Sequence, residues 1–283
     1  MYDDFQALKL INSWLLDRVI ARFPCGVRQY TMVEFNDPDV GPVRITSSIK
    51  VFDQFFNNLV ATGGGDCPEL AVTGLELALT TSPPQSFILV LTDASALDYD
   101  NASLVQRTRS LISTTKSQIF FLITGLCDGL NDPAFLIYRE LASLSYGHVF
   151  QVPLSDLNKV FNYLDFTLAR PVNSSVQLYS GEFTVSNHSD NFVIPSIFAE
   201  FIVTIDGTIY SIHITGPDSV TVEITVVVFE IWGSIYMVKN PIKGLWSIHV
   251  HAEGQHSIRI KGFEGRVFSA SIPCCTLRLL HYV

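Results

Sequence analysis

The chain has 283 residues and a formal charge of −9, with a sequence pI near 5.2. This acidic balance disfavours nucleic-acid binding, which needs an excess of Lys and Arg against the phosphates. Hydrophobic residues make up 48% of the chain and charged residues 16%, so large cores are expected, and the length suits two domains. No apolar run reaches the roughly 18 residues of a membrane helix, and the first residues do not have a signal-peptide pattern.

Helices and strands are predicted to alternate over residues 1–169. The stretch "SFILVLTDAS" is almost continuously apolar, which is typical of a strand covered on both faces in a parallel sheet. The pattern predicts a doubly wound, Rossmann-like α/β domain whose loops after the strands form one functional rim. The expected helices cover residues 4–21, 48–60, 68–79, 102–115, 133–145 and 155–168, and the expected strands cover 27–35, 42–46, 86–95, 118–124 and 148–152.

Period-two strands replace helices beyond the sequence "ARPVNSSV". The segments "SVTVEITV", "LWSIHVHA" and "HSIRIKGF" each alternate apolar and polar residues, as strands with one buried face do. We place the boundary near Pro171 and predict an all-β antiparallel, Ig-like sandwich over residues 170–283.

Acidic residues cluster at three places where rim loops are expected. Asp3 and Asp4 lie at the start, Asp66 and Glu69 in "GGGDCPE", and Asp93 at the C-terminal end of the apolar strand. Carboxylate and hydroxyl oxygens are the ligands that Mg²⁺ and Ca²⁺ prefer. The alternative for each residue alone is a helix cap, which is a common role for Asp after a strand.

The motifs "GGGDCPE", "FILVLTDA" and "QIFFLITGLC" resemble those of von Willebrand factor type A domains, in particular those of hemicentins, which are extracellular-matrix proteins. The resemblance covers about residues 1–168, and "KGLWSIHVHAEGQHSIRIKGF" is similar to the segment that follows the A domain in hemicentins. It implies a secreted adhesion or matrix module that binds an acidic residue of a protein partner through a rim-bound Mg²⁺ or Ca²⁺. Glu69 and Asp93 would hold the ion, Asp66 would support it, and Asp3 and Asp4 would hold an adjacent cation.

The family's metal site opens with D-x-S-x-S at the end of a central first strand, and "MYDD" matches the residues that follow this motif in integrin β chains. We therefore expect this strand and motif to be absent, as in a fragment or a truncated gene product. Losing five or six buried apolar residues forfeits on the order of 10 kcal/mol, against a whole-domain stability of about 5–15 kcal/mol. The domain would then fold poorly or pair its open edge with something else. The alternative function is a structural or assembly module without a working metal site.

Five cysteines leave the compartment open. Cys67 and Cys127 both lie on expected rim loops, where a disulfide would suit an extracellular domain; the alternative is two thiols in a reducing compartment. Cys25 is expected to be an unpaired core residue. Sequons for N-glycosylation occur at Asn101, Asn173 and Asn187 and favour the secretory route.

Other functions have weaker support. The glycine-rich turn lacks the Lys-Ser/Thr of a phosphate loop. The sequence also shows no motif that pairs a nucleophile with a base, so an enzyme is not expected. His249 and His251, with His256 across an expected hairpin, would allow a zinc site. The alternative is a solvated face opposite Trp246, Ile248 and Val250. An intracellular A-domain scaffold also remains, which glycan occupancy at Asn101 or Asn173 would exclude.

Overall fold

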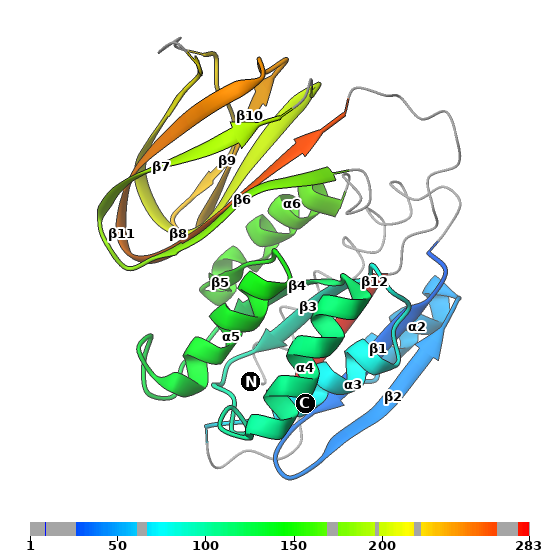
Figure 1. The fold of residues 1–283 in the computed structure, drawn as a ribbon. Coiled ribbons are helices and arrows are strands. Elements are labelled where there is room, and N and C mark those ends of the chain that lie inside the picture. The colour runs from blue at the N-terminus through cyan, green and yellow to red at the C-terminus, as the bar shows by residue number, and fades with distance from the viewer. Residues whose placement is uncertain are drawn as a thin grey trace. The chain divides into compact units, whose positions relative to one another are not determined.

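The computed structural model describes residue 9 and residues 27–60, 67–168, 175–195, 198–217, 222–264 and 277–282. The chain divides into two compact units, each of which can be followed in Figure 1. The first comprises Met1–Asp165 and Ser271–Val283, and the second comprises Phe166–Ala270. The expected division at 169/170 therefore differs in two respects, because the boundary falls at 165/166 and residues 271–283 belong to the first unit.

A six-stranded sheet forms the centre of the first unit, in the order β2-β1-β12-β3-β4-β5. β1 and β2 are antiparallel, and all other neighbours are parallel. Every residue of β1, β3 and β4 is buried, as the continuous apolar pattern predicts for a parallel sheet. The strands are β1 (Tyr30–Phe35), β2 (Val40–Thr46), β3 (Phe87–Thr92), β4 (Gln118–Ile123), β5 (Val149–Gln151) and β12 (Leu277–Tyr282).

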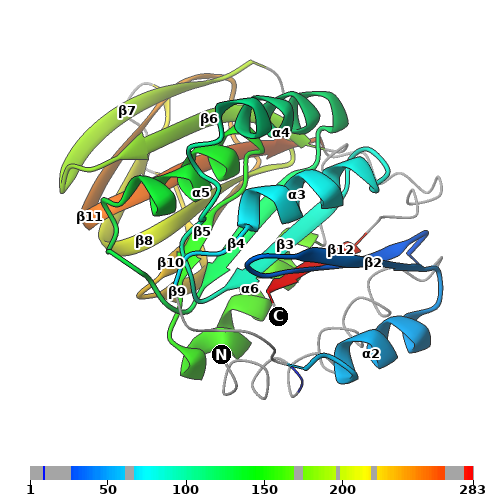
Figure 2. The same ribbon diagram turned by 90° about the horizontal axis from the view of Figure 1, so that it is seen from below.

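Helices cover both faces of this sheet. Figure 2 shows α3, α4 and α5 on one face and α2 and α6 on the other, so the doubly wound α/β prediction is confirmed. The expected helix over residues 4–21 lies outside the described residues, apart from residue 9. The helices are α2 (Ile49–Asn57), α3 (Ala71–Thr80), α4 (Ala102–Thr115), α5 (Pro133–Leu144) and α6 (Leu157–Leu168), with a 3₁₀ turn over Leu154–Asp156.

Side-chain caps explain where several helices begin. Ser48 Oγ accepts from the Val51 N–H before α2, and Asn101 Oδ1 accepts from the Leu104 N–H before α4. Asp132 caps α5 in the same way, with Pro133 at the first helical position. These contacts satisfy N–H groups that have no partner within the helix. Each helix therefore begins at a residue that the sequence specifies.

The central position of the sheet is held by β12, from the far end of the chain. This strand runs parallel to β1 on one side and to β3 on the other. If the domain folds, we expect the open edge of this sheet to pair with something else. In the structure, Leu277–Tyr282 fills this place, and no sequence pattern predicts this segment as a strand of the α/β unit.

The second unit is one antiparallel sheet with the order β6-β11-β8-β10-β9, and β7 pairs with the first part of β11. Its two longest strands, β8 and β11, shift register after His251 and again after Glu253. Such bulges bend a sheet. The all-β antiparallel prediction is confirmed, and the strands form one connected sheet where an Ig-like sandwich would have two. The strands are β6 (Ser175–Phe183), β7 (Asn187–Ile194), β8 (Glu200–Thr215), β9 (Thr225–Glu230), β10 (Gly233–Lys239) and β11 (Gly244–Phe263).

Aromatic and branched residues form the core of this unit. Trp246 is 1% exposed, contacts the rings of Phe192 and Phe201, and donates from Nε1 to the Ile242 carbonyl oxygen at 2.9 Å. Ile258 and other inward-facing residues of β8, β10 and β11 complete this core. The alternating pattern in the sequence therefore corresponds to one buried and one exposed face.

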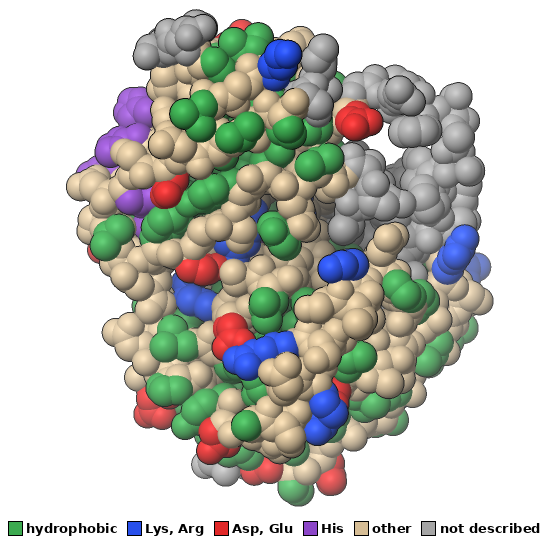
Figure 3. Space-filling view, in the orientation of Figure 1, with side chains coloured by type: hydrophobic (Ala, Val, Ile, Leu, Met, Phe, Trp, Pro, Cys, Tyr) green, Lys and Arg blue, Asp and Glu red, His purple; other side chains and the backbone are tan. Residues whose placement is uncertain are grey.

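The histidines of β11 do not lie as the zinc hypothesis requires. The expected hairpin between His251 and His256 is wrong, because one strand continues through both residues. His249 and His251 are exposed, opposite a buried face that includes Trp246 and Val250, and Figure 3 shows the histidine side chains gathered on the surface of this unit. In the described part of the chain, no three His, Cys, Asp or Glu residues are grouped to hold a metal ion. The solvated-face interpretation is therefore confirmed for His249 and His251, whereas His256 is fully buried.

Candidate metal-binding rim

The candidate site lies where β3 and β4 end. Asp93 directly follows β3 and is half-buried. The loop after β4 lies close to it, since the Thr124 N–H donates to the Thr92 carbonyl oxygen at 3.0 Å. A Cβ atom on Gly125 would lie 2.5 Å from the Asp93 carbonyl oxygen, so only glycine allows this approach. The two loops form one edge of the sheet, as parallel strands dictate.

The turn that carries Glu69 is joined to the loop after β3. The Glu69 N–H donates to the Ser95 carbonyl oxygen at 2.9 Å, and the Leu97 N–H donates to the Glu69 carbonyl oxygen at 2.7 Å. Glu69 and Ala96 thereby form an isolated parallel bridge. The Glu69 residue is 2% exposed. The structure thus brings the Glu69 turn and the Asp93 loop together, as the sequence predicts.

A disulfide joins the same turn to the loop after β4. Cys67 and Cys127 are bonded, with their Cα atoms 5.5 Å apart. The Ser95 N–H donates to Cys127 Sγ at 3.2 Å, so the sulfur also contacts the loop after β3. Three separate loops are therefore held at the rim by covalent and hydrogen bonds. This is the pairing that the sequence analysis expects for an extracellular domain.

Asp98 has a structural role that the sequence analysis missed. Its Oδ1 accepts from the Val72 N–H at 3.1 Å, and its Oδ2 accepts from the Thr73 N–H at 2.7 Å and from the Thr73 hydroxyl at 2.6 Å. The carboxylate therefore caps the N-terminus of α3, where negative charge is favourable. The helix-cap alternative concerns the predicted site residues, so this cap on a helix that precedes Asp98 in the chain is a separate finding.

The pKa of Tyr138 responds to the negative charges near the rim. Burial raises the pKa of its phenol well above the usual value, and the charges of Asp98 and Glu69 raise the pKa further. The phenol therefore stays neutral and donates to the Ala94 carbonyl oxygen at 3.1 Å. Both carboxylates therefore act on one buried hydroxyl, which contacts the loop after β3 at Ala94.

These residues offer oxygen donors of the kind that Mg²⁺ and Ca²⁺ prefer. The side chains of Glu69 and Asp93 supply carboxylates, and the Ser95 hydroxyl is buried without a hydrogen-bond partner among the described residues. Their chemistry fits a hard cation, although the described residues contain no group of three acidic, His or Cys ligands. The other predicted ligands, Asp3, Asp4 and Asp66, lie outside the described residues.

The glycosylation and thiol predictions fall partly within the described residues. Asn101 and Asn187 are exposed, and Asn101 caps α4 through Oδ1, which leaves its amide nitrogen outside that bond. Asn173 and Cys25 lie outside the described residues. Both exposed asparagines are therefore accessible to modification.

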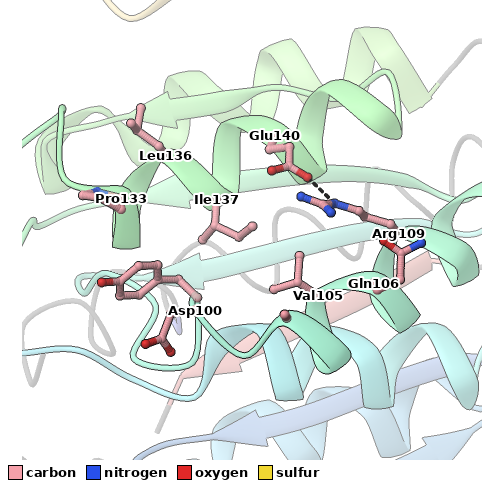
Figure 4. Close-up of a pocket in the computed structure, with 10 residues that line it drawn as sticks. Asp100, Val105, Gln106, Arg109, Pro133, Leu136, Ile137 and Glu140 are labelled. Carbon is pink, nitrogen blue, oxygen red and sulfur yellow. Dashed lines mark hydrogen bonds and ion pairs between the residues drawn. The ribbon is translucent and has the colours of Figure 1, made fainter.

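A groove lies between α4 and α5. It has a volume of about 640 Å³, and Figure 4 shows Arg109 and Glu140 bridging it through an ion pair between the two helices. Asp100, just before α4, and Pro133, at the start of α5, line the end nearest the rim loops. No helix in the described part of the chain is long and apolar enough to cross a membrane.

Comparisons with known proteins agree with this architecture. A family model described as von Willebrand factor A domain matches residues 1–153. Hemicentin-1 from Mus musculus is 31% identical over 277 residues, covering 95% of this chain and 5% of the hemicentin. Von Willebrand factor A domain-containing protein 7 from Rattus norvegicus is 30% identical over 253 residues, covering 82% of this chain and 27% of that protein.

The chain thus spans about one twentieth of the hemicentins that it matches. Among solved structures, a von Willebrand factor type A protein from Catenulispora acidiphila aligns with 92% of this chain and 58% of that chain, at 12% identity and a TM-score of 0.41. The family model covers more than half of the chain and includes the rim loops with Glu69 and Asp93. The chain therefore belongs to the von Willebrand factor A domain family and is hemicentin-like.

Proposed function

We propose that this chain is a secreted adhesion or matrix module that binds a protein partner through a divalent cation at the rim. The observation that carries the proposal is the linkage of three loops by the Cys67–Cys127 disulfide and the Glu69 backbone bonds. This linkage places two carboxylate-bearing loops at one edge. Disulfides persist mainly in oxidising compartments, which supports an extracellular location, as does the similarity to hemicentins.

In this proposal, Glu69 and Asp93 hold Mg²⁺ or Ca²⁺ and the Ser95 hydroxyl supplies a further oxygen. The bound ion would leave a coordination position for an acidic side chain of the partner. Asp98 acts as a positioning residue, because it fixes the start of α3 directly after the Glu69 turn. No nucleophile–base pair enters this account, so we assign the chain a binding role and no catalytic one.

Calorimetric titration of the secreted chain with CaCl₂ and MgCl₂ tests the cation site. We expect a dissociation constant of about 10⁻⁴–10⁻³ M, as in other extracellular modules. Glu69→Gln and Asp93→Asn should each weaken binding at least tenfold. Glu76→Gln is the matched control, because Glu76 lies on the exposed side of α3 and pairs with Arg107. Equal affinity in all variants would contradict the assignment.

Adhesion of the immobilised chain to cell-derived matrix tests the partner function. Binding should require Mg²⁺ or Ca²⁺, disappear with a chelator and be lost in Asp93→Asn. A glycan at Asn101 or Asn187 after secretion, detected as a mobility shift on enzymatic deglycosylation, would support the extracellular location and contradict an intracellular scaffold.

A structural or assembly module without a working metal site is the second candidate. The observation that favours it is that no three His, Cys, Asp or Glu residues in the described ranges are grouped as metal ligands. A chain that shows no heat of cation binding but retains its fold would support this candidate and overturn the first.

A further inference from the structure

The central strand of the first sheet comes from a distant part of the sequence. β12 pairs with Thr31–Phe35 of β1 and with Phe87–Leu91 of β3, and Figure 1 shows it lying between these two strands. Met32, Val33, Ile88 and Val90 of the flanking strands are fully buried. Without β12, buried N–H and C=O groups along both neighbours would lose their partners, which is costly. We call this position the strand slot, defined by the facing edges of β1 and β3.

The sequence of β12 is poorly matched to a central parallel strand. β3 reads "FILVLT" and β4 reads "QIFFLI", whereas β12 reads "LRLLHY". Strands buried on both faces of parallel sheets are usually continuous apolar runs, yet β12 includes Arg278 and His281. β12 is thus less apolar along its sequence than either β3 or β4.

The connection to β12 is long enough for exchange. Residues 264–276 separate the end of β11 from the start of β12. Fully extended, a connection of this length spans about 45 Å. This reach allows β12 to enter the slot of its own chain or that of a second copy. Every copy carries both the strand and the slot, so reciprocal insertion would produce a closed two-fold dimer.

We propose that β12 is an exchangeable strand through which two copies of this chain associate, each completing the sheet of the other. The proposal does not depend on cation binding at the rim. The connection of residues 264–276 holds β12 near the slot of its own chain at an effective concentration in the millimolar range. At low protein concentration, each β12 therefore occupies the slot of its own chain. Concentrated chains exchange strands when they fold together, and the exchanged dimer then separates slowly because separation requires opening the centre of the sheet.

Refolding at two concentrations is the first test. The full chain is refolded at about 1 µM and at about 500 µM, in the range that brackets the effective concentration of a tethered strand. Each sample is then analysed by size exclusion with light scattering. We expect monomer from the first and a slowly dissociating dimer from the second, with the dimer fraction raised at least fivefold. Denaturing electrophoresis without reductant must show monomers, which excludes linkage through Cys274 or Cys275. Monomer under both conditions would overturn the proposal.

A complementation test separates strand exchange from dimerisation through another surface. The first chain carries Leu280→Pro, which removes a backbone donor from β12, and is labelled with ¹⁵N. We expect its β3 amides to exchange at least tenfold faster than in the native chain. The amides of Ile258 and Ile260 in the second unit should remain protected and thus show that this unit is folded.

The second chain is unlabelled and carries Val33→Pro, which damages its slot and leaves its β12 intact. When the two chains are refolded together, its β12 should enter the slot of the labelled chain and restore protection to β3. A partner with both substitutions is the matched control and should restore nothing. Failure of the intact β12 to restore protection would overturn strand exchange, whatever the outcome of the cation titrations.

Discussion

The two units of this chain differ in how far apart in the sequence their paired strands lie. The second unit takes all of its strands from Ser175–Phe263, each within one continuous segment of the chain. The first unit takes its central strand from Leu277–Tyr282, after the whole of the second unit. The second unit is therefore an insertion between α6 and the strand that completes the first sheet. This difference predicts that the two units depend unequally on the end of the chain.

Truncation after Ala270 is the strongest way to test this difference. The truncated chain loses β12 and its five register pairs with each neighbour. With a net contribution of about 1 kcal/mol for each hydrogen bond, the loss is on the order of 5–10 kcal/mol. This is comparable to the whole stability of a domain. We expect the first unit to unfold while the second stays folded, which amide exchange of β3 and β11 would show. Equal protection of β3 in both chains would refute the role of β12.

Large aromatic residues in the two cores should act only within their own unit. Phe120 is fully buried and stacks on Phe87 with ring centroids 4.8 Å apart, and Trp246 is its counterpart in the second unit. Phe120→Ala and Trp246→Ala should each cost about 3–5 kcal/mol, through lost burial and the cavity left behind. Denaturant unfolding followed by amide exchange should show each loss in one unit only. A loss shared equally by both units would contradict independent cores.

Sequence patterns predict the local elements of the first unit well, because each has a specific local cause. The expected bounds of α4 agree with Ala102–Thr115, since Asn101 caps its start and Lys116 adopts a left-handed conformation at its end. The buried strands β3 and β4 are equally clear, as continuous apolar runs. The rim follows from the order of the elements, because loops after parallel strands share one edge.

The sequence patterns did not predict contacts between residues that lie far apart in the chain. β12 was missed because Arg278 and His281 interrupt its apolar run, and because no local pattern shows which slot a strand will fill. β11 was predicted as two strands because Gly254 suggests a turn, whereas the structure has a register shift there. Asp98 was missed at the rim because the helix that it caps lies 26 residues earlier.

The second unit should also differ from the first in its response to pH. Burial, and next the charge of Arg259, lower the pKa of Lys261 to about 7, against about 10.4 in an unfolded chain. Between pH 7 and 9 the unfolded state binds more protons at this residue, so the free energy of unfolding should rise with pH. Lys261→Met should flatten this rise, which we expect to be on the order of 1–2 kcal/mol after solvent screening. Denaturant titrations at pH 7, 8 and 9 would measure it. A rise that Lys261→Met leaves unchanged would assign the effect to another group.

The smallest effect is expected at a surface ion pair of the first unit. Arg107 Nε donates to Glu76 Oε1 at 2.6 Å, and the Arg107 side chain is 57% exposed. In the second unit, by contrast, the Arg259 side chain is 1% exposed and donates to the Gly181 carbonyl oxygen at 3.0 Å. Water and salt screen an exposed pair, and holding two long side chains costs entropy that offsets its attraction.

We therefore expect Arg107→Ala to shift the melting temperature of the first unit by about 1 °C or less at low salt, and by less still at high salt, where the pair is screened. Thermal unfolding at low and high salt would measure this shift. A larger shift that salt abolishes would mean that the α3–α4 surface is held by charge more than by the buried contacts beneath it. Because α3 begins at the Glu69 turn, such a result would also connect this surface pair to the rim.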